Sequence, residues 1–578
     1  MLARGDIPDG PRVLTAWIDA PRPDAGIHVL GAEEWAFHPY PEVAARVRGT
    51  AERLREAGVR PGDAVGVIDP DGLGFVTGFF AALRAGATPL PLPPRSPRPA
   101  TFVADLAAIV AAGEARAVLT GGETAEPARA AAAVVAAAAG SREPAVVVAD
   151  PEAAGDGAPF APLPEVALLQ FTSGSTGRPR GVRVTGANLA VHTATIRRWL
   201  EWGPDDPAAC WLPLHHDMGL IGLMLTSVLG QSTLWQLRPE RFLWQPHRWI
   251  ECFDAARGAA AVTAAPTFGY GYAARRTDPA RLEGMDLAPL RSAVVGAERL
   301  IPRPLARFVE LLTPHGLRPT ALRPAYGLAE GTLAVTGTPA GTAPAMVGID
   351  WAAARPGEEI AVTAPRPLAA DGDGDGDGAD GALLSCGVPL DAVAVTVRDE
   401  DGHPVADGVL GEIAVTGPSV ADGYHATASN GSTRFADGVL HTGDAGFLSG
   451  GELFVVGRIA DSVKVRGQRL YAENVEERVT TATGVAPHRC LAVPLPGAGG
   501  DGLAVLLEDE RAREAAGLAV RATRGLAGPD VGVRVYALPH GTIARTTSGK
   551  PRRRQMWREL ADGALERFAV DGEAAPVT

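Results

Sequence analysis

The feature that most constrains the fold is an alternation of helical and strand patterns in the first third of the chain. Residues 41–58 repeat apolar positions at helical spacing and end on a glycine, a common helix stop. Residues 64–70 then have the pattern of a short buried strand, residues 75–86 of a helix, and residues 115–120 of another strand. The alanine-rich stretch 128–140 predicts a surface helix. Such alternation predicts an α/β fold with a largely parallel sheet.

The chain is too long for a single hydrophobic core. Its 578 residues predict two or more domains. The mixed-charge segment after residue 460 is large enough to form a small domain. Residues 370–381 form a Gly-Asp repeat without large apolar side chains, which predicts a mobile loop.

The charge and cysteine content argue against several classes of protein. The net charge of −13 is atypical of a nucleic-acid-binding protein. The four cysteines are far apart without the spacing of paired ligands, which argues against a zinc site or a disulfide framework and favours a reducing compartment. The N-terminal segment lacks an apolar signal core, and no window holds about 18 consecutive apolar residues. We therefore expect a cytoplasmic protein without a membrane span.

A lysine near the C-terminus contrasts with the rest of the composition. The chain has 54 basic residues, of which only Lys464 and Lys550 are lysines. Lys550 lies in the segment Ala-Arg-Thr-Thr-Ser-Gly-Lys-Pro-Arg-Arg-Arg, residues 544–554, with arginines on both sides. A compact ammonium on a flexible stem makes contacts that a planar guanidinium cannot imitate. We interpret Lys550 as a residue required by the chemistry of a site; chance survival in an arginine-rich chain is the alternative.

Residues 168–182 contain a loop suited to phosphate binding. An apolar, strand-like run precedes a series of hydroxyl residues and glycines, which exposes successive backbone N–H groups and allows a polyphosphate to approach closely. The segment is not a Walker loop, because no Gly-Lys-Ser/Thr follows at the required spacing. A flexible linker is the alternative, although a linker is not expected directly after a buried strand. The candidate residues are Thr172, Ser173, Gly174, Ser175, Thr176 and Gly177.

This loop resembles the phosphate loop of the adenylate-forming enzymes, a superfamily that includes acyl-CoA synthetases, peptide-synthetase adenylation domains and firefly luciferase. Three further segments match in the order of that family. Residues 323–333 resemble the adenine- and magnesium-binding segment, and residues 440–467 resemble the segment with the ribose-binding aspartate and the interdomain hinge. Residues 546–554 resemble the motif that carries the catalytic lysine.

The resemblance implies a fold and a reaction. The fold is a large N-terminal α/β region of several subdomains, residues 1–459, and a small mobile α/β lid, residues 460–578, with a hinge near Ala460. The cofactors are ATP and Mg²⁺, and the nucleotide is expected between the two domains. The first half-reaction joins a carboxylate to the α-phosphate of ATP and releases pyrophosphate. Because two anions meet, positive charge must be concentrated at that point.

The resemblance also implies a role for each matched residue. Lys550 bridges the attacking carboxylate and the phosphate or ribose oxygens, and Glu330 holds Mg²⁺ together with Thr172. Tyr326 stacks on adenine. The other implied residues are Gly296, Ala297, Glu298 and Gly327 beside adenine, Asp444 and Arg458 at the ribose, His216 near the substrate carboxylate, and Lys464 in the second half-reaction. Taken singly, a core tyrosine, solvated charges and a structural histidine are the alternatives.

Three other segments resemble one branch of the superfamily, the fatty acyl-AMP ligases. They are residues 211–225, residues 239–253, and residues 346–359 with the insert that follows. This branch transfers the acyl group to the phosphopantetheine arm of an acyl carrier protein, so the resemblance implies a fatty acid substrate and a separate carrier protein as acceptor. The alternatives are a ligase that uses free coenzyme A and a catalytically silent sensor of acyl-adenylate or nucleotide.

The chain departs from the family pattern at four positions. Arg180 replaces the usual lysine of the phosphate loop, Gly186 replaces an expected histidine, and Ala460 replaces the usual Asp or Lys of the hinge. Lys464 favours coenzyme A as the acceptor, because fatty acyl-AMP ligases often have an apolar residue there.

Two apolar segments bear on the substrate and the acceptor. Residues 220–230 predict an apolar helix that either lines an acyl tunnel or belongs to the core. The insert is expected to pack against the large domain and to restrict access of free coenzyme A. Its expected anchors are Ile349, Trp351, Ile360 and Val362.

Overall fold

The computed structural model describes most of the chain. The described residues are 12–95, 101–139, 143–150, 155, 161–172, 179–351, 354–368, 382–426, 432–465, 468–496, 502–529, 531–546 and 550–570. The Gly-Asp repeat at 370–381, the loop residues Ser173–Gly177 and the side chain of Lys464 lie outside this description, so their predicted roles remain predictions.

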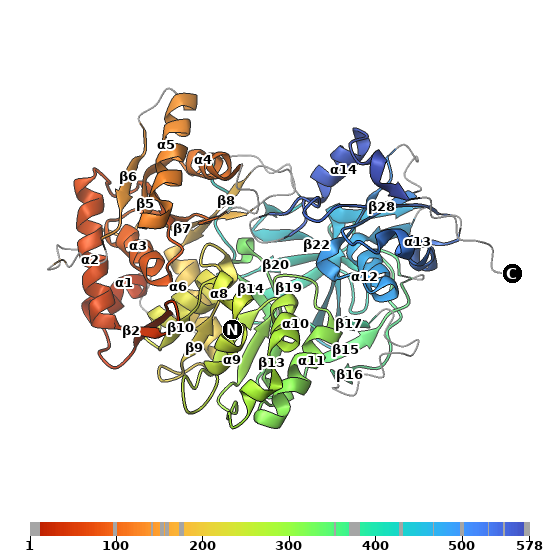
Figure 1. The fold of residues 1–578 in the computed structure, drawn as a ribbon, viewed down its shortest axis with the longest axis horizontal. Coiled ribbons are helices and arrows are strands. Elements are labelled where there is room, and N and C mark those ends of the chain that lie inside the picture. The colour runs from red at the N-terminus through yellow and green to blue at the C-terminus, as the bar shows by residue number, and fades with distance from the viewer. Residues whose placement is uncertain are drawn as a thin grey trace.

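The N-terminal part contains a four-stranded parallel sheet in the order β4-β3-β5-β6 (Figure 1). Its strands are β3 (Ala64–Ile68), β4 (Thr88–Pro91), β5 (Ala115–Thr120) and β6 (Ala145–Val148). Its helices are α2 (Tyr40–Glu56), α3 (Gly72–Arg84), α4 (Phe102–Ala112) and α5 (Ala125–Ala139). The alternation of helices and strands predicted for this region is confirmed.

The largest sheet has nine strands in the order β18-β14-β13-β12-β11-β9-β10-β1-β2. Its six central strands pair in parallel, and antiparallel pairs close both edges. The strands are β1 (Gly26–Leu30), β2 (Trp35–Pro39), β9 (Ala208–Cys210), β10 (Leu234–Gln236), β11 (Val262–Ala265), β12 (Ser292–Val295), β13 (Leu322–Gly327), β14 (Ala334–Gly337) and β18 (Val388–Pro389). The helices of this part of the chain are α1 (Val13–Asp19), α6 (Gly186–Trp199), α7 (Thr226–Leu229), α8 (Pro239–Trp244), α9 (His247–Glu251), α10 (Thr267–Arg276) and α11 (Pro302–Leu312).

Antiparallel strands follow in the chain and complete the part before residue 460. A five-stranded sheet contains β19 (Ala394–Arg398), β20 (Gly411–Thr416), β21 (Arg434–Ala436), β22 (Val439–Ser449) and β23 (Glu452–Arg458). A three-stranded sheet contains β15 (Ala345–Gly348), β16 (Arg366–Pro367) and β17 (Ala382–Leu384). The hairpin of β7 (Val166–Thr172) and β8 (Arg180–Thr185) flanks the predicted phosphate loop.

The C-terminal segment, drawn in blue in Figure 1, builds a separate sheet in the order β26-β27-β28-β29. Two hydrophobic clusters of buried residues lie in this segment and draw all of those residues from positions after 460. Its elements are β24 (Ser462–Val465), β25 (Gln468–Tyr471), α12 (Ala472–Thr483), β26 (Cys490–Pro494), β27 (Gly502–Leu507), α13 (Ala512–Ala527), β28 (Gly532–Ala537), α14 (Arg553–Ala561) and β29 (Ala569–Val570).

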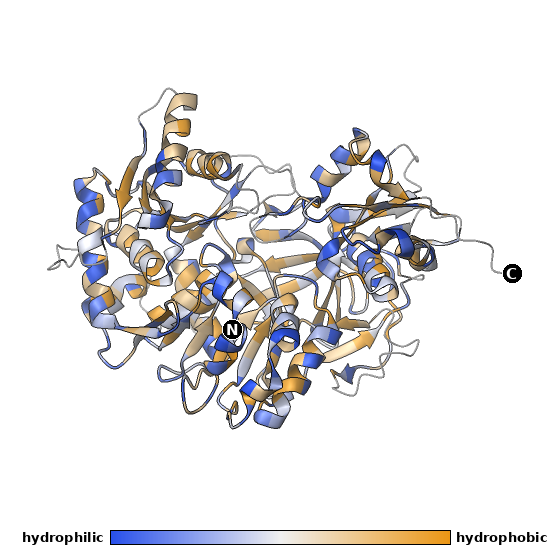
Figure 2. Cartoon of the chain, in the orientation of Figure 1, coloured by the Kyte–Doolittle hydropathy of each residue, from blue (hydrophilic) through white to orange (hydrophobic). Residues whose placement is uncertain are grey.

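Hydropathy follows the layering of helices on sheets. Figure 2 shows apolar strands in the interior and hydrophilic residues on helices at the periphery. Helix α11 illustrates the cause, because its buried residues Leu305, Phe308, Val309 and Leu312 recur at the spacing of one helix face. Among the helices that the structure describes, none combines the length and the apolar composition needed to cross a membrane.

The apolar helix predicted over residues 220–230 is present but differs in its geometry. It begins as a π-helix, Met218–Leu225, and continues as α7. Gly219 permits its close approach to the preceding turn, since a Cβ there would lie 2.7 Å from the carbonyl oxygen of Pro213. The sequence could not distinguish a π-helix from an α-helix here. A helix that is apolar on all sides has no polar face from which to infer the number of residues per turn. Such local widening is frequent at functional sites.

The insert packs through some of its expected anchors but not all. Ile349 and Ile360 are buried in a cluster with Phe447, and Trp351 is partly buried. Val362 is 36% exposed, so its prediction as an anchor is wrong. This segment pairs with its neighbours through isolated bridges rather than as a continuous strand. In a regular strand, residues two apart point to the same face, but here Ile360 is buried and Val362 is exposed.

Two glycines with positive φ give a test of the packing near β17 and β18. Gly387 has φ +75°, and a Cβ there would lie 2.0 Å from the backbone of Gly337. Gly357 has φ +80°, and a Cβ there would meet open space within 4 Å. Gly357→Ala should cost about 1–2 kcal/mol from backbone strain alone. Gly387→Ala should lower the thermal midpoint more than Gly357→Ala does, because the new Cβ would also clash with the backbone of Gly337. Equal midpoints in thermal denaturation of the two variants would contradict this packing.

Candidate functional site

Strand pairing positions an aspartate and an arginine that the sequence motif separates by fourteen residues. The register of β22 and β23 places Asp444 opposite Arg458. Arg458 Nε lies 3.0 Å from Asp444 Oδ1. From the end of β13, the Tyr326 hydroxyl donates to Asp444 Oδ2 at 2.7 Å. Both carboxylate oxygens are therefore held, which fixes the direction of the side chain.

Burial and charge set the protonation of these three groups. Burial raises the pKa of Asp444, and the Arg458 guanidinium opposes that shift. The nearby Asp444 carboxylate in turn raises the pKa of Arg458. Burial raises the pKa of Tyr326 well above its usual value, and Asp444 adds to the effect. At neutral pH, Tyr326 is therefore a hydrogen-bond donor and Arg458 is a cation.

Glu330 and Thr172 provide oxygen atoms at the predicted metal site. Glu330 is only 5% exposed, and its Oε1 accepts a hydrogen bond of 2.6 Å from the Tyr424 hydroxyl. Arg180 Nη2 lies 4.0 Å from the same oxygen, and the guanidinium packs 4.5 Å from the centroid of the Tyr424 ring. Tyr424 lies outside every matched motif, so sequence reasoning missed it.

Unpartnered buried atoms at this site fit the predicted cofactors. Within the described part of the chain, the Thr172 hydroxyl and Nε and Nη1 of Arg180 are buried without a hydrogen-bond partner. Buried polar atoms rarely remain unpaired in a folded protein. A hydroxyl and a carboxylate suit Mg²⁺, which prefers oxygen ligands. Thr172 pairs with Arg180 in the β7–β8 register, and the Arg180 guanidinium lies 4.0 Å from Glu330 Oε1. Free guanidinium N–H groups suit phosphate oxygens. Arg180 thus occupies the predicted lysine position as a potential phosphate contact.

The predicted adenine-binding segment, residues 296–298, follows the end of β12 and contacts β13 and α10. Gly296 lies close to β13, since a Cβ there would be 3.0 Å from the carbonyl oxygen of Ala325. Ala297 has a φ of +66°, which is uncommon for a residue with a side chain. Glu298 Oε1 accepts a hydrogen bond of 2.8 Å from the backbone N–H of Phe268 at the start of α10. Strained backbone of this kind is typical of ligand sites.

Lys550 is itself exposed, and its positive charge acts on buried carboxylates from three segments of the chain. Burial raises the pKa of Asp217, Glu298 and Asp444, and in each case the Lys550 ammonium opposes the shift. Two hydrogen bonds join Lys550 to Thr546, because the Lys550 N–H donates to Thr546 Oγ1 at 3.1 Å and the Lys550 carbonyl accepts from the Thr546 N–H at 2.8 Å. The sequence motifs at 296–298, 444 and 550 are therefore close enough to interact electrostatically.

His216 lies in the turn before the π-helix, next to a second histidine. The ring centroids of His215 and His216 are 4.2 Å apart. Burial and the neighbouring His216 lower the pKa of His215 well below its usual value. Gln170 Nε2 donates to the His215 carbonyl at 2.9 Å, which ties this turn to the strand that precedes the phosphate loop. Asp217, the next residue, is a further candidate for the site that the sequence analysis did not name, although it lies within the matched segment.

The fold and site define a class of protein. Residues 19–425 match the family model described as AMP-binding enzyme, which is more than half of the chain. The chain therefore belongs to the AMP-binding enzyme family. Members of this family use ATP with Mg²⁺.

Particular relatives narrow the class. The chain is 32% identical to the long-chain-fatty-acid–AMP ligase FadD26 of Mycobacterium marinum over 92% of this chain and 91% of that protein. It is 31% identical to the FadD26 ligase of Mycobacterium tuberculosis over the same shares. A solved structure from a study of fatty acyl-adenylate ligases of E. coli and L. pneumophila is 28% identical, with a TM-score of 0.81 over 97% of this chain and 99% of that chain.

The Tyr326–Asp444 hydrogen bond gives a test of the nucleotide site. Tyr326→Phe keeps the ring but removes the donor that orients Asp444, so the dissociation constant for AMP should rise about 3–10-fold, the scale of one hydrogen bond. Isothermal titration with AMP measures the effect. Tyr270→Phe is the matched control, because Tyr270 is also buried but donates to the Val294 carbonyl at 2.8 Å. Unchanged AMP affinity in Tyr326→Phe would contradict the placement of the ribose at Asp444.

Proposed function

We propose that the protein adenylates a fatty acid with ATP, releasing pyrophosphate, and then transfers the acyl group to the phosphopantetheine thiol of a separate acyl carrier protein. Residues 1–459 form the domain that binds ATP and the acid, and residues 460–578 form a mobile lid. The observation that carries the proposal is the position of Lys550, whose charge acts on carboxylates from three elements of the large domain.

Membership of the family and the likeness to fatty acid–AMP ligases support the substrate class. The site contributes an independent reason. The buried Arg180 guanidinium and Thr172 hydroxyl, together with the exposed Lys550 ammonium, are groups that a nucleoside triphosphate requires. The apolar π-helix begins directly after His216 and Asp217. A polar head and an apolar tail of a substrate thus find matching surroundings at adjacent positions.

In the first half-reaction, a carboxylate oxygen of the acid attacks the α-phosphorus of ATP, the bond to the β-phosphate oxygen breaks, and pyrophosphate leaves with the electron pair. Lys550 lowers the repulsion between the two anions as they approach. Glu330 and Thr172 hold Mg²⁺, which offsets negative charge on the phosphates when bound. Asp444 accepts from the ribose hydroxyls, Arg458 and Tyr326 keep it oriented, and the strained segment at Ala297 lies beside adenine.

The second half-reaction places a different face of the lid at the site. The lid turns at Ala460, which lies in the short 3₁₀ turn Ile459–Asp461 that joins β23 to β24. Rotation withdraws Lys550 and brings Lys464 of β24 toward the acyl-adenylate. The thiol sulfur attacks the acyl carbonyl, a thioester forms, and AMP leaves. Such exchange of lid faces separates the requirements of two reactions at one nucleotide site.

Free coenzyme A is the second candidate acceptor. Lys464 favours it, and one relative, 32% identical over 88% of this chain, is named provisionally as a fatty-acid–CoA ligase of Mycobacterium tuberculosis. The insert with buried Ile349 and Ile360 favours the carrier protein, because packing at this position restricts the approach of a small thiol. All four cysteines are unpaired, which supports a reducing cytoplasmic location.

The two lysines should act in different half-reactions. Lys550→Ala should lower the rate of adenylate formation by about 10²–10³, the scale for removal of one preorganised charge. Lys550→Arg should be nearly as slow, because a guanidinium fork is too wide for the position. Lys464→Ala serves as the contrast and should slow acyl transfer only. Pyrophosphate release with ATP and a panel of acids measures the first step; retained activity in Lys550→Arg would contradict the role given to Lys550.

The acceptor can be decided by product analysis. With ATP, a fatty acid and coenzyme A, the enzyme should accumulate acyl-AMP, because the insert restricts access of the free thiol. Addition of a phosphopantetheinylated carrier protein should then discharge the adenylate as acyl-carrier thioester. Mass spectrometry of both thioesters gives the yields. Rapid formation of acyl-CoA would overturn the carrier proposal and favour the coenzyme A ligase.

A further inference from the structure

Arg299 connects the adenine segment to the C-terminal region. It directly follows Glu298, and its guanidinium lies 2.7 Å from Glu477 Oε2 in an ion pair. It also donates a hydrogen bond to Asn474 Oδ1. Both partners are on α12. The Arg299 and Glu477 side chains are 13% and 24% exposed, so water screens this pair only in part.

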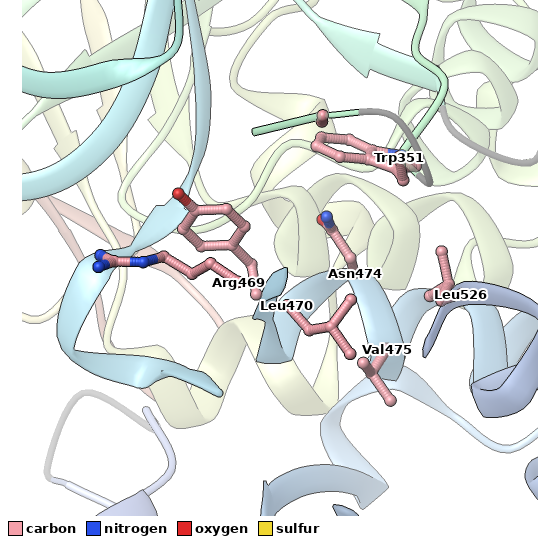
Figure 3. Close-up of a pocket in the computed structure, with 8 residues that line it drawn as sticks. Trp351, Arg469, Leu470, Asn474, Val475 and Leu526 are labelled. Atoms are coloured by element: carbon pink, nitrogen blue, oxygen red, sulfur yellow. The ribbon is translucent and has the colours of Figure 1, made fainter. Parts of the chain in front are cut away.

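A third segment joins this contact through Trp351. The guanidinium carbon of Arg299 lies 5.9 Å from the centroid of the Trp351 ring, within the range of a cation–π interaction. Trp351 also packs against the hydrophobic cluster that contains Leu470 and Val475. Figure 3 shows the Trp351 ring on one side of a small pocket and Asn474 and Val475 on the other. Arg299 therefore lies where three segments distant in sequence meet.

The same helix also holds the segment that carries Lys550. Arg553, three residues after Lys550, is only 12% exposed and forms ion pairs with Glu473, at 3.4 Å, and with Glu476. Glu477 of α12 therefore binds Arg299, and Glu473 and Glu476 of the same helix bind Arg553. A displacement of α12 away from Arg299 has to carry the Arg553 segment, and with it Lys550, away from the nucleotide site.

We propose that Arg299 is a positioning residue for adenylate formation, which acts through Glu477 and Asn474 to hold α12 in the orientation that presents Lys550 to the site. The inference rests on the proposed lid function and adds a residue to which the family motifs assign no role. Arg299 touches neither acid nor phosphate in this role. Its effect is to raise the fraction of molecules in which the lid is oriented for the first half-reaction.

The proposal has a consequence for the balance between the two half-reactions. Rotation of the lid must break the Arg299–Glu477 pair, and a charge left alone at a partly buried position is costly. The pair therefore favours the first orientation and opposes the second. Loss of the pair should slow adenylate formation and should not slow discharge of the adenylate. A merely structural residue would affect both steps in the same direction.

Three variants of the full-length chain test this role. Arg299→Gln and Glu477→Gln should each lower kcat for pyrophosphate release about 10-fold, with less than a twofold change in the KM for ATP, because nucleotide contacts are retained. The exchange Arg299→Glu with Glu477→Arg should restore part of the rate. Arg291→Gln is the matched control, because Arg291 forms an ion pair of the same length, 2.7 Å, with Asp206, away from α12. The control should keep the wild-type rate.

A readout without substrate separates this inference from the proposed function. Amide hydrogen exchange by mass spectrometry should show faster exchange in peptides covering residues 469–480 of Arg299→Gln than of Arg291→Gln. If no acid is adenylated by the wild-type protein, the proposed function fails, while faster exchange still supports the contact of Arg299 with α12. Unchanged exchange, or an equal fall of both half-reactions without rescue by the charge exchange, would overturn the role of Arg299.

Discussion

The burial of several carboxylates at one site is the constraint on which the rest of the arrangement depends. Asp217, Glu298 and Asp444 come from three different segments of the chain, and burial raises the pKa of each. Removing such groups from water costs several kcal/mol per ion unless a cation or hydrogen bonds compensate. Lys550 is a cation common to all three, and it comes from the C-terminal segment. The C-terminal segment therefore contributes positive charge to the site as well as covering it.

The sequence was sufficient for the fold class and for several helices and strands of the N-terminal part. The helical and strand patterns of α2, β3, α3 and β5 are local properties, and the structure confirms them. The matched motifs are local stretches of sequence, whereas the contacts of Asp444 with Tyr326 and Arg458 come from the tertiary fold. Local patterns are predictable because each residue's neighbours in space are its neighbours in the chain.

The features that the sequence could not provide depend on distant contacts. Tyr424 reaches Glu330 across 94 residues, and no periodicity or motif marks it. The π-helix at Met218–Leu225 is uniformly apolar, so its pattern does not differ from that of an ordinary buried helix. Val362 was wrongly expected to be an anchor, because the backbone here forms only isolated bridges and its side chain is exposed while that of Ile360 is buried. Tertiary packing decides in each of these cases.

The buried cysteines give the molecule a chemical property of practical use. All four are unpaired and buried, and burial raises the pKa of Cys210 and Cys386 to about 12. Alkylating reagents react with the thiolate, which is scarce at neutral pH when the pKa is this high. A cysteine introduced on the surface of α12 or of α10 would therefore be the one thiol open to a maleimide dye in the folded protein. The natural chain serves as its own unreactive background for fluorescence measurements of how these two helices move.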